Sequence, residues 1–104
     1  MITLHDRALA LENRFAYEEG EQFRATARRN KLIGLWAGQL LGKSNPIAYA
    51  EEFAAWAVEH HDDKAMTARL RSEFAAAALV LDEQDLATRM REMLLETLAE
   101  MRAP

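Results

Sequence analysis

The chain has 104 residues, of which 50% are hydrophobic and 29% are charged, and its formal net charge is −4. This length and composition predict a single globular domain and exclude a fully disordered chain. Because cysteine is absent, disulfide frameworks, thiolate metal sites and cysteine nucleophiles are excluded.

The acidic net charge also argues against nucleic-acid binding, which needs a clustered basic surface. The first residues, Met1 to Asp6, lack the basic and apolar regions of a secretory signal. We therefore expect a cytoplasmic protein that does not bind nucleic acid.

Helix-forming residues dominate the sequence, which contains only four glycines and two prolines. No segment alternates apolar and polar residues as a strand does. The predicted fold class is all-α.

The first helical segment begins at Thr3, where a hydroxyl stands three residues before the carboxylate of Asp6, as in a capping box. A thin apolar stripe follows at helical spacing and consists of Leu4, Ala8, Leu11 and Phe15. The rest of this segment is polar or charged, so it has little surface to dock on a core.

Gly20 stands among three glutamates, where we expect a bend or a loss of order. The helical pattern then resumes from Phe23 to Gly42. One helix from Asp6 to Gly42 would be about 55 Å long, whereas a compact chain of this size has a radius of gyration of about 13 Å. The first residues must therefore fold back, project into solvent or remain disordered. We predict a mobile, partly helical arm over residues 1–20 and a four-helix domain over 21–104.

The segment from Leu32 to Leu41 is apolar on nearly every side, which predicts a central helix buried all round. Gly34 and Gly38 lie four residues apart on one face, where a neighbouring helix can approach closely. The apolar run is about half the length needed to cross a bilayer, so we expect no membrane insertion.

Three further helix starts are marked by polar caps: Asn45 before Pro46, Asp62 with Asp63, and Asp82. The predicted buried stripes are Ile47, Ala50, Phe53, Ala54, Ala57 and Val58, then Met66, Leu70, Phe74, Ala77, Ala78 and Leu81, then Leu86, Met90, Met93, Leu94, Thr97, Leu98 and Met101. Short connections favour antiparallel packing into a four-helix bundle.

The sequence offers no phosphate-binding loop and no nucleophile within a recognisable motif, so we expect a protein that is not an enzyme. Possible metal ligands concentrate only in the run from Glu59 to Asp63. Neighbouring helical residues point about 100° apart, and histidine and aspartate here suit helix capping. We therefore predict no metal site.

Basic side chains gather in the first half of the central segment: Arg24, Arg28, Arg29 and Lys31. With Trp36 and Tyr49 nearby, they can hold an anionic ligand with a flat ring, such as ATP or ADP, by ion pairing and stacking. The alternative is a solvated face whose arginines pair with Glu21.

Specific residue patterns go further than composition. They are Asp6-Arg7, Glu12-Asn13-Arg14-Phe15-Ala16, Phe23-Arg24-Ala25, the run Ala27 to Ala37, Leu41-Gly42 and Tyr49-Ala50. Together they closely resemble the zeta subunit family, small alphaproteobacterial inhibitors of the F-type ATP synthase. The similarity extends over the whole chain and is most specific from Phe23 to Ala37.

This resemblance implies a four-helix bundle with an inhibitory N-terminal segment that inserts into the catalytic head of the synthase and blocks rotation in the hydrolytic direction. The inhibitory segment then contains Asp6, Arg7, Leu11, Glu12, Arg14, Phe15 and Ala16. Leu11 and Phe15 serve as anchors, and the charged residues set orientation. In the alternative, these two residues dock back on the bundle.

The implied partners are the catalytic, non-catalytic and rotor subunits. No cofactor is expected to be required, some family members bind adenine nucleotides, and the free protein is expected to be monomeric.

Overall fold

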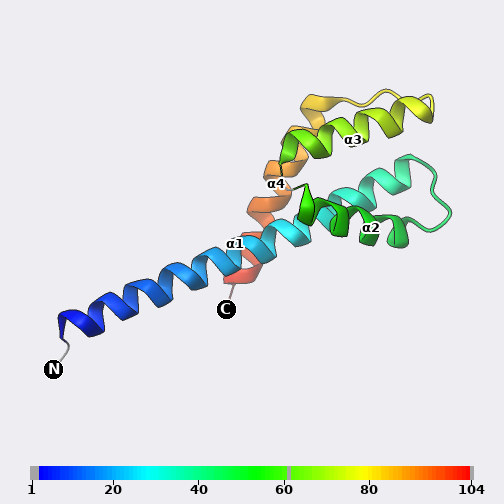
Figure 1. The fold of residues 1–104 in the computed structure, drawn as a ribbon. Coiled ribbons are helices and arrows are strands. Elements are labelled where there is room, and N and C mark those ends of the chain that lie inside the picture. Colours follow the sequence, from blue (N-terminus) through cyan, green and yellow to red (C-terminus); the bar gives the residue numbers. More distant parts are fainter. Residues whose placement is uncertain (1–2, 61, 104) are drawn as a thin grey trace.

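A computed structural model describes residues 3–60 and 62–103, without the side chains of Phe15 and Ala16. Within these ranges the chain forms helices and no strand. The helices are α1 (Leu4–Leu40), α2 (Pro46–Glu59), α3 (Asp63–Ala76) and α4 (Glu83–Arg102) (Figure 1). The all-α helical bundle predicted from the sequence is confirmed.

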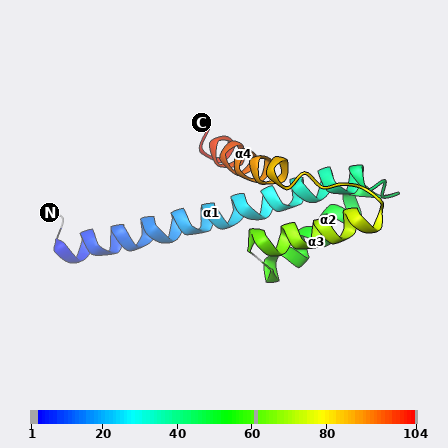
Figure 2. The same cartoon turned by 90° about the horizontal axis from the view of Figure 1, so that it is seen from above.

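The molecule is elongated because α1 extends far beyond the other helices (Figures 1 and 2). Its principal extents are 66 × 27 × 24 Å and its radius of gyration is 17.6 Å, against about 13 Å for a compact chain of this length. Of the three arrangements left open by the length argument, the structure has the first residues projecting away from the bundle. We call residues 3–20 the arm.

The prediction of a bend or a loss of order at Gly20 is wrong, because α1 runs without interruption from Leu4 to Leu40. A glycine inside a helix costs about 1 kcal/mol, but extending a helix that is already nucleated costs far less than starting a new one. The packed part of α1 supplies that nucleus. At the other end, Thr3 accepts from the Asp6 amide and the Asp6 carboxylate accepts from the Thr3 amide, so the predicted capping box is confirmed.

Helices α1 and α2 approach each other closely at two glycines, as the sequence predicts. A Cβ atom on Gly34 would lie 3.0 Å from Ala50 Cα and 3.1 Å from Phe53 Cβ, and one on Gly38 would lie 2.9 Å from Tyr49 Cδ1. These distances leave no room for a side chain. The two glycines therefore set the spacing between the two helices.

The complete burial expected for the central segment is wrong in part. Ile33 and Ala37 are fully buried, but Leu32 is 41% exposed and Leu40 is 52% exposed. Within the described part of the chain, the helices that pack extensively on α1 are α2 and α4, and one side of α1 stays open to solvent. Among the described residues, no helix combines the length and the non-polar character that crossing a bilayer requires.

All four helices contribute to one core, which consists of Ile33, Ala37, Phe53, Ala57, Met66, Leu70, Phe74, Leu86 and Met90. In the predicted stripe of α2, the assignment of two residues to the core is wrong: Ile47 is 62% exposed and Val58 is 56% exposed. Both lie in terminal turns of α2, Ile47 in the first and Val58 in the last, and their side chains are open to solvent there.

Helix α3 ends earlier than its predicted stripe. Ala77 caps it, and Ala78 has a φ of 59°, in the left-handed region that glycine usually occupies at a helix C-terminus. The Leu79 amide then bonds the Phe74 carbonyl at 2.8 Å. Ala77 and Ala78 are therefore exposed rather than buried, while Leu81 packs on the core from the connection to α4.

The predicted polar starts are confirmed: Asn45, Asp62 and Asp82 each accept a hydrogen bond from a backbone amide in the first turn of α2, α3 and α4. Past the end of α1, Gly42 has a φ of 71°, and the Lys43 amide bonds the Gly38 carbonyl at 3.0 Å. The glycine stop signal is therefore also confirmed.

The two kinds of glycine in α1 give a matched test of packing against helix propensity. Gly34→Ala should lower the free energy of unfolding by about 1–2 kcal/mol, because overpacking costs more than the gain in helix propensity. Gly20→Ala should raise it by up to about 1 kcal/mol, since a Cβ atom at this position would have Arg24 Nη1 as its nearest neighbour, at 3.4 Å. Urea unfolding of both variants measures the difference, and equal effects would contradict the tight α1–α2 spacing.

Candidate functional site

The arm presents an unpartnered apolar face. Every described side chain from residue 3 to residue 19 is exposed, with Leu4 at 83%, Leu11 at 66% and Tyr17 at 66%. In both views no other helix lies beside the arm (Figures 1 and 2). Leu11 does not dock back on the bundle, which was the alternative to partner binding.

The apolar face of the arm continues the core-facing side of α1. At 100° per residue, Leu11 comes within about 40° of Ala25 and of Ile33 around the helix axis. Ala25 and Ile33 are fully buried in the bundle. The side of α1 that its neighbours cover within the bundle is therefore left uncovered along the arm.

Charged residues of the predicted inhibitory segment lie around this face. Asp6 belongs to the capping box, and Arg14 Nε lies 3.4 Å from Glu18 Oε1 in an exposed pair. Arg7 and Glu12 are exposed. Phe15 and Ala16 lie within helix α1, and their side chains are outside the described part of the chain.

The predicted basic group is divided by the structure. Arg24, Arg28 and Lys31 are exposed and share the open side of α1, as their spacing predicts. Arg29 is only 4% exposed and points instead toward α3. Its Nη2 lies 2.9 Å from Asp63 Oδ1 and 2.8 Å from Asn30 Oδ1.

The aromatic residues considered for stacking lie on other sides of the bundle. Trp36 packs against Phe74, with ring centroids 6.1 Å apart, and the Arg89 guanidinium lies 5.0 Å from its ring. The Tyr49 hydroxyl donates a hydrogen bond to Glu73 at 2.6 Å. Burial, and then this hydrogen bond, raise the pKa of Tyr49. Neither ring is placed next to Arg24, Arg28 and Lys31.

The expected pairing of Glu21 with Arg24 or Arg28 is replaced by longer-range pairs. Glu21 is 5% exposed and accepts from Arg102 Nε at 2.5 Å, which ties the last turn of α4 to the base of the arm. Arg28 Nη2 lies 3.9 Å from Glu100 Oε2, also on α4. Both pairs connect α4 to α1, and the Glu21–Arg102 pair is the one with a buried partner.

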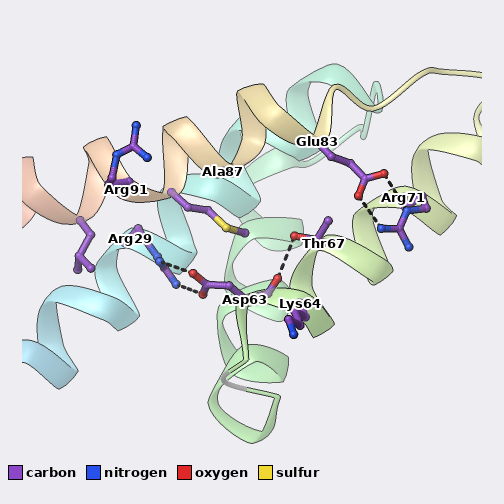
Figure 3. A pocket seen from close by; sticks show the side chains of 10 residues that line it. Arg29, Asp63, Lys64, Thr67, Arg71, Glu83, Ala87 and Arg91 are labelled. Atoms are coloured by element: carbon purple, nitrogen blue, oxygen red, sulfur yellow. Dashed lines mark hydrogen bonds and ion pairs between the residues drawn. The ribbon is translucent and has the colours of Figure 1, made fainter.

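A cavity of about 650 Å³ opens between α3 and α4 and has Arg29 at one end (Figure 3). It has an apolar floor and a charged rim, and its lining residues are Arg29, Asp63, Lys64, Thr67, Arg71, Glu83, Ala87, Met90, Arg91 and Leu94. We call it the α3–α4 cavity.

The charges of the α3–α4 cavity are unequally compensated. Arg29 pairs with Asp63. Arg71 pairs with Glu83 through two hydrogen bonds, one from Nε to Oε2 and one from Nη2 to Oε1 (Figure 3). The hydrogen bond from Arg71 lowers the pKa of Glu83. Among the described residues, Lys64 and Arg91 have no ion-pair partner. The rim therefore carries two uncompensated positive charges, which favour an anionic ligand.

Sequence reasoning missed this cavity because its residues are far apart in the chain. One local signal exists: Lys64, Thr67 and Arg71 recur at spacings of three and four and so share a face of α3. The contributions of Arg29 and Arg91 depend on how α1 and α4 pack, which that spacing does not reveal.

Fold and site together define a small helical bundle whose longest helix is extended into an unpartnered amphipathic arm. A comparison with known families assigns this class: residues 1–100 match the family described as ATPase inhibitor subunit zeta, and the chain belongs to this family. No curated protein sequence matches the chain. The resemblance inferred from the residue patterns is confirmed, and an inhibitor family indicates a regulatory role.

The Arg29–Asp63 pair gives a stability prediction. Asp63→Asn leaves the buried guanidinium of Arg29 with Asn30 as its remaining partner, so unfolding should become easier by about 1–3 kcal/mol. Glu18→Gln is the control, because the Arg14–Glu18 pair is exposed, and its loss should cost about 0.5 kcal/mol or less. Thermal unfolding of both variants measures this, and equal effects would show that Arg29 does not depend on Asp63.

Proposed function

We propose that the protein inhibits ATP hydrolysis by the F-type ATP synthase by inserting its N-terminal arm into the catalytic head, where it blocks rotation. The observation that carries this proposal is the arm itself. It is helical and exposed, and its apolar side continues the core-facing side of α1. Membership of an ATPase inhibitor family supports the identity of the target.

The physical logic is that of an amphipathic helix binding in a groove. Leu11 is 66% exposed in the free protein, so a groove that covers it gains about 1–2 kcal/mol from this residue. Phe15 is the second proposed anchor. The charged residues Asp6, Arg7, Glu12 and Arg14 orient the arm. A groove between catalytic and non-catalytic subunits next to the rotor is the receptor that the family resemblance implies.

Residues 1–20 are proposed as the inhibitory arm and residues 21–104 as the domain that carries it. Glu21 is the first buried residue among the described side chains, and it is bonded to α4. Among the described side chains, the bundle core includes none from the arm. This function further implies a cytoplasmic protein that is monomeric when free.

Removal of residues 1–19 tests this division of labour. The truncated protein should fold, as judged by circular dichroism, and should fail to inhibit ATP hydrolysis by a purified alphaproteobacterial catalytic head. Leu11→Ala should raise the concentration for half-maximal inhibition about tenfold. Val80→Ala is the matched control, since Val80 is 95% exposed and lies outside the arm. Full inhibition by the truncated protein would disprove the arm mechanism.

A second candidate function is adenine-nucleotide binding, favoured by the α3–α4 cavity. Its volume suits a nucleotide, and Lys64 and Arg91 can pair with phosphates while the apolar floor contacts the base. Arg29, from the predicted basic group, lines this cavity. Arg24, Arg28, Lys31 and Trp36 form the alternative site predicted from the sequence.

One titration separates the two nucleotide sites. With ATP added to millimolar concentration and amide shifts followed by NMR, Lys64→Met and Arg91→Met should each weaken binding about tenfold if the cavity is the site. Lys31→Met should leave affinity unchanged. The reverse pattern would locate the ligand on the open face of α1, and the absence of any shift in the unmodified protein would end both versions.

A further inference from the structure

An apolar groove lies between α1 and α2 where the arm joins the bundle. It has a volume of about 340 Å³ and is lined by Phe23, Thr26, Ala27, Asn30, Ala57 and Val58. Phe23 is 63% exposed and Val58 is 56% exposed. We call it the shoulder groove.

The antiparallel packing of α1 and α2 puts the shoulder groove at the base of the arm. Gly38 of α1 lies beside the start of α2 at Pro46, and Gly34 lies beside Ala50 and Phe53. The last turn of α2 therefore reaches α1 near Ala27, which lines the groove with Val58. Phe23 follows Gly20 by three residues, or about 4.5 Å along the helix axis.

The two large apolar side chains of the groove lie outside the core of the bundle. Neither Phe23 nor Val58 belongs to the core cluster or to the residues packed on it. Among the described residues, no ionisable side chain lines the groove. Large exposed apolar residues grouped beside one another mark interaction sites more often than isolated ones do. The absence of charge in the lining indicates a non-polar occupant.

The unbroken α1 helix connects the groove to the arm. Since α1 passes through Gly20 as one continuous helix, the structure places the shoulder groove at a defined distance and direction from Leu11. A partner that encloses the arm, which is about 25 Å long over residues 4–20, must have its entrance beside Phe23. A second contact on the same rigid body adds affinity without a further loss of translational freedom.

We propose that the shoulder groove is a second docking surface, which receives a non-polar side chain or loop from the ATPase subunit at the entrance of the groove that holds the arm. This inference rests on the proposed inhibitory function. It assigns Phe23 and Val58 to partner affinity, and it leaves blockage of rotation to the arm.

Full-length Phe23→Ala and Val58→Ala variants test the second contact by inhibition of ATP hydrolysis by the purified catalytic head. Each should raise the concentration for half-maximal inhibition by about fivefold to tenfold, with complete inhibition still reached at saturation. Ile47→Ala is the matched control. Ile47 is 62% exposed and lies on α2, as Val58 does, but at the end of that helix away from the arm. It should change this concentration by less than about twofold. Circular dichroism checks that all three variants fold.

The outcomes separate the two proposals. If the unmodified protein inhibits and both groove variants inhibit equally well, the second contact is disproved while the arm mechanism stands. If the unmodified protein does not inhibit, the inhibitory function itself fails and the second contact fails with it. Sedimentation that showed a dimer of the unmodified protein and a monomer of Phe23→Ala would overturn the inference in another way, by making a second copy the occupant.

Discussion

The close contact of α1 and α2 at Gly34 and Gly38 is the constraint on which the rest of the structure depends. It brings Phe53 of α2 into the core that all four helices share. Helix α3 is then held to α2 by Arg69, whose guanidinium lies 5.0 Å from the Phe53 ring and 4.8 Å from the Trp56 ring. Stacking of this kind stabilises a partly desolvated guanidinium.

Helix α1 serves two purposes because one hydrogen-bonded backbone passes from bundle to arm. The bundle orders residues 21–40 by burying Ala25, Ile33 and Ala37, and the arm inherits a helix that is already nucleated. A short separate helix of the same sequence is marginal in water. The bundle thus stabilises the helical conformation of the arm, although the described arm side chains bury no apolar surface against it.

Much of the fold could be predicted from local sequence. Caps at Asn45, Asp62 and Asp82 and the glycine stop at Gly42 each act within a few residues, so their signals are visible in the chain. The close approach at Gly34 also follows from spacing alone. The family resemblance indicates the arm residues of the candidate site, and their exposure follows from the length of α1.

Other features depend on packing between distant segments and were predicted wrongly or missed. Gly20 stays helical because the packed part of α1, which is C-terminal to it, has already nucleated the helix. Ala78 takes a conformation that its side chain disfavours, and no local signal marks it. Arg29 is separated from the basic group by Asp63, which is 34 residues away. The cations of the α3–α4 cavity come together only when three helices are assembled.

The capping box at the tip of the arm has a consequence for desolvation. The first turn of any helix has backbone amides without partners inside the helix, and an unpaired amide costs free energy when water is removed. In this chain Thr3 and Asp6 each accept from the other's amide, and the Arg7 amide bonds the Thr3 carbonyl at 3.1 Å. The capping box therefore supplies acceptors for two of the four amides in the first turn, those of Thr3 and Asp6. A surface that encloses the tip has fewer bare backbone donors to compensate than it would at an uncapped helix end.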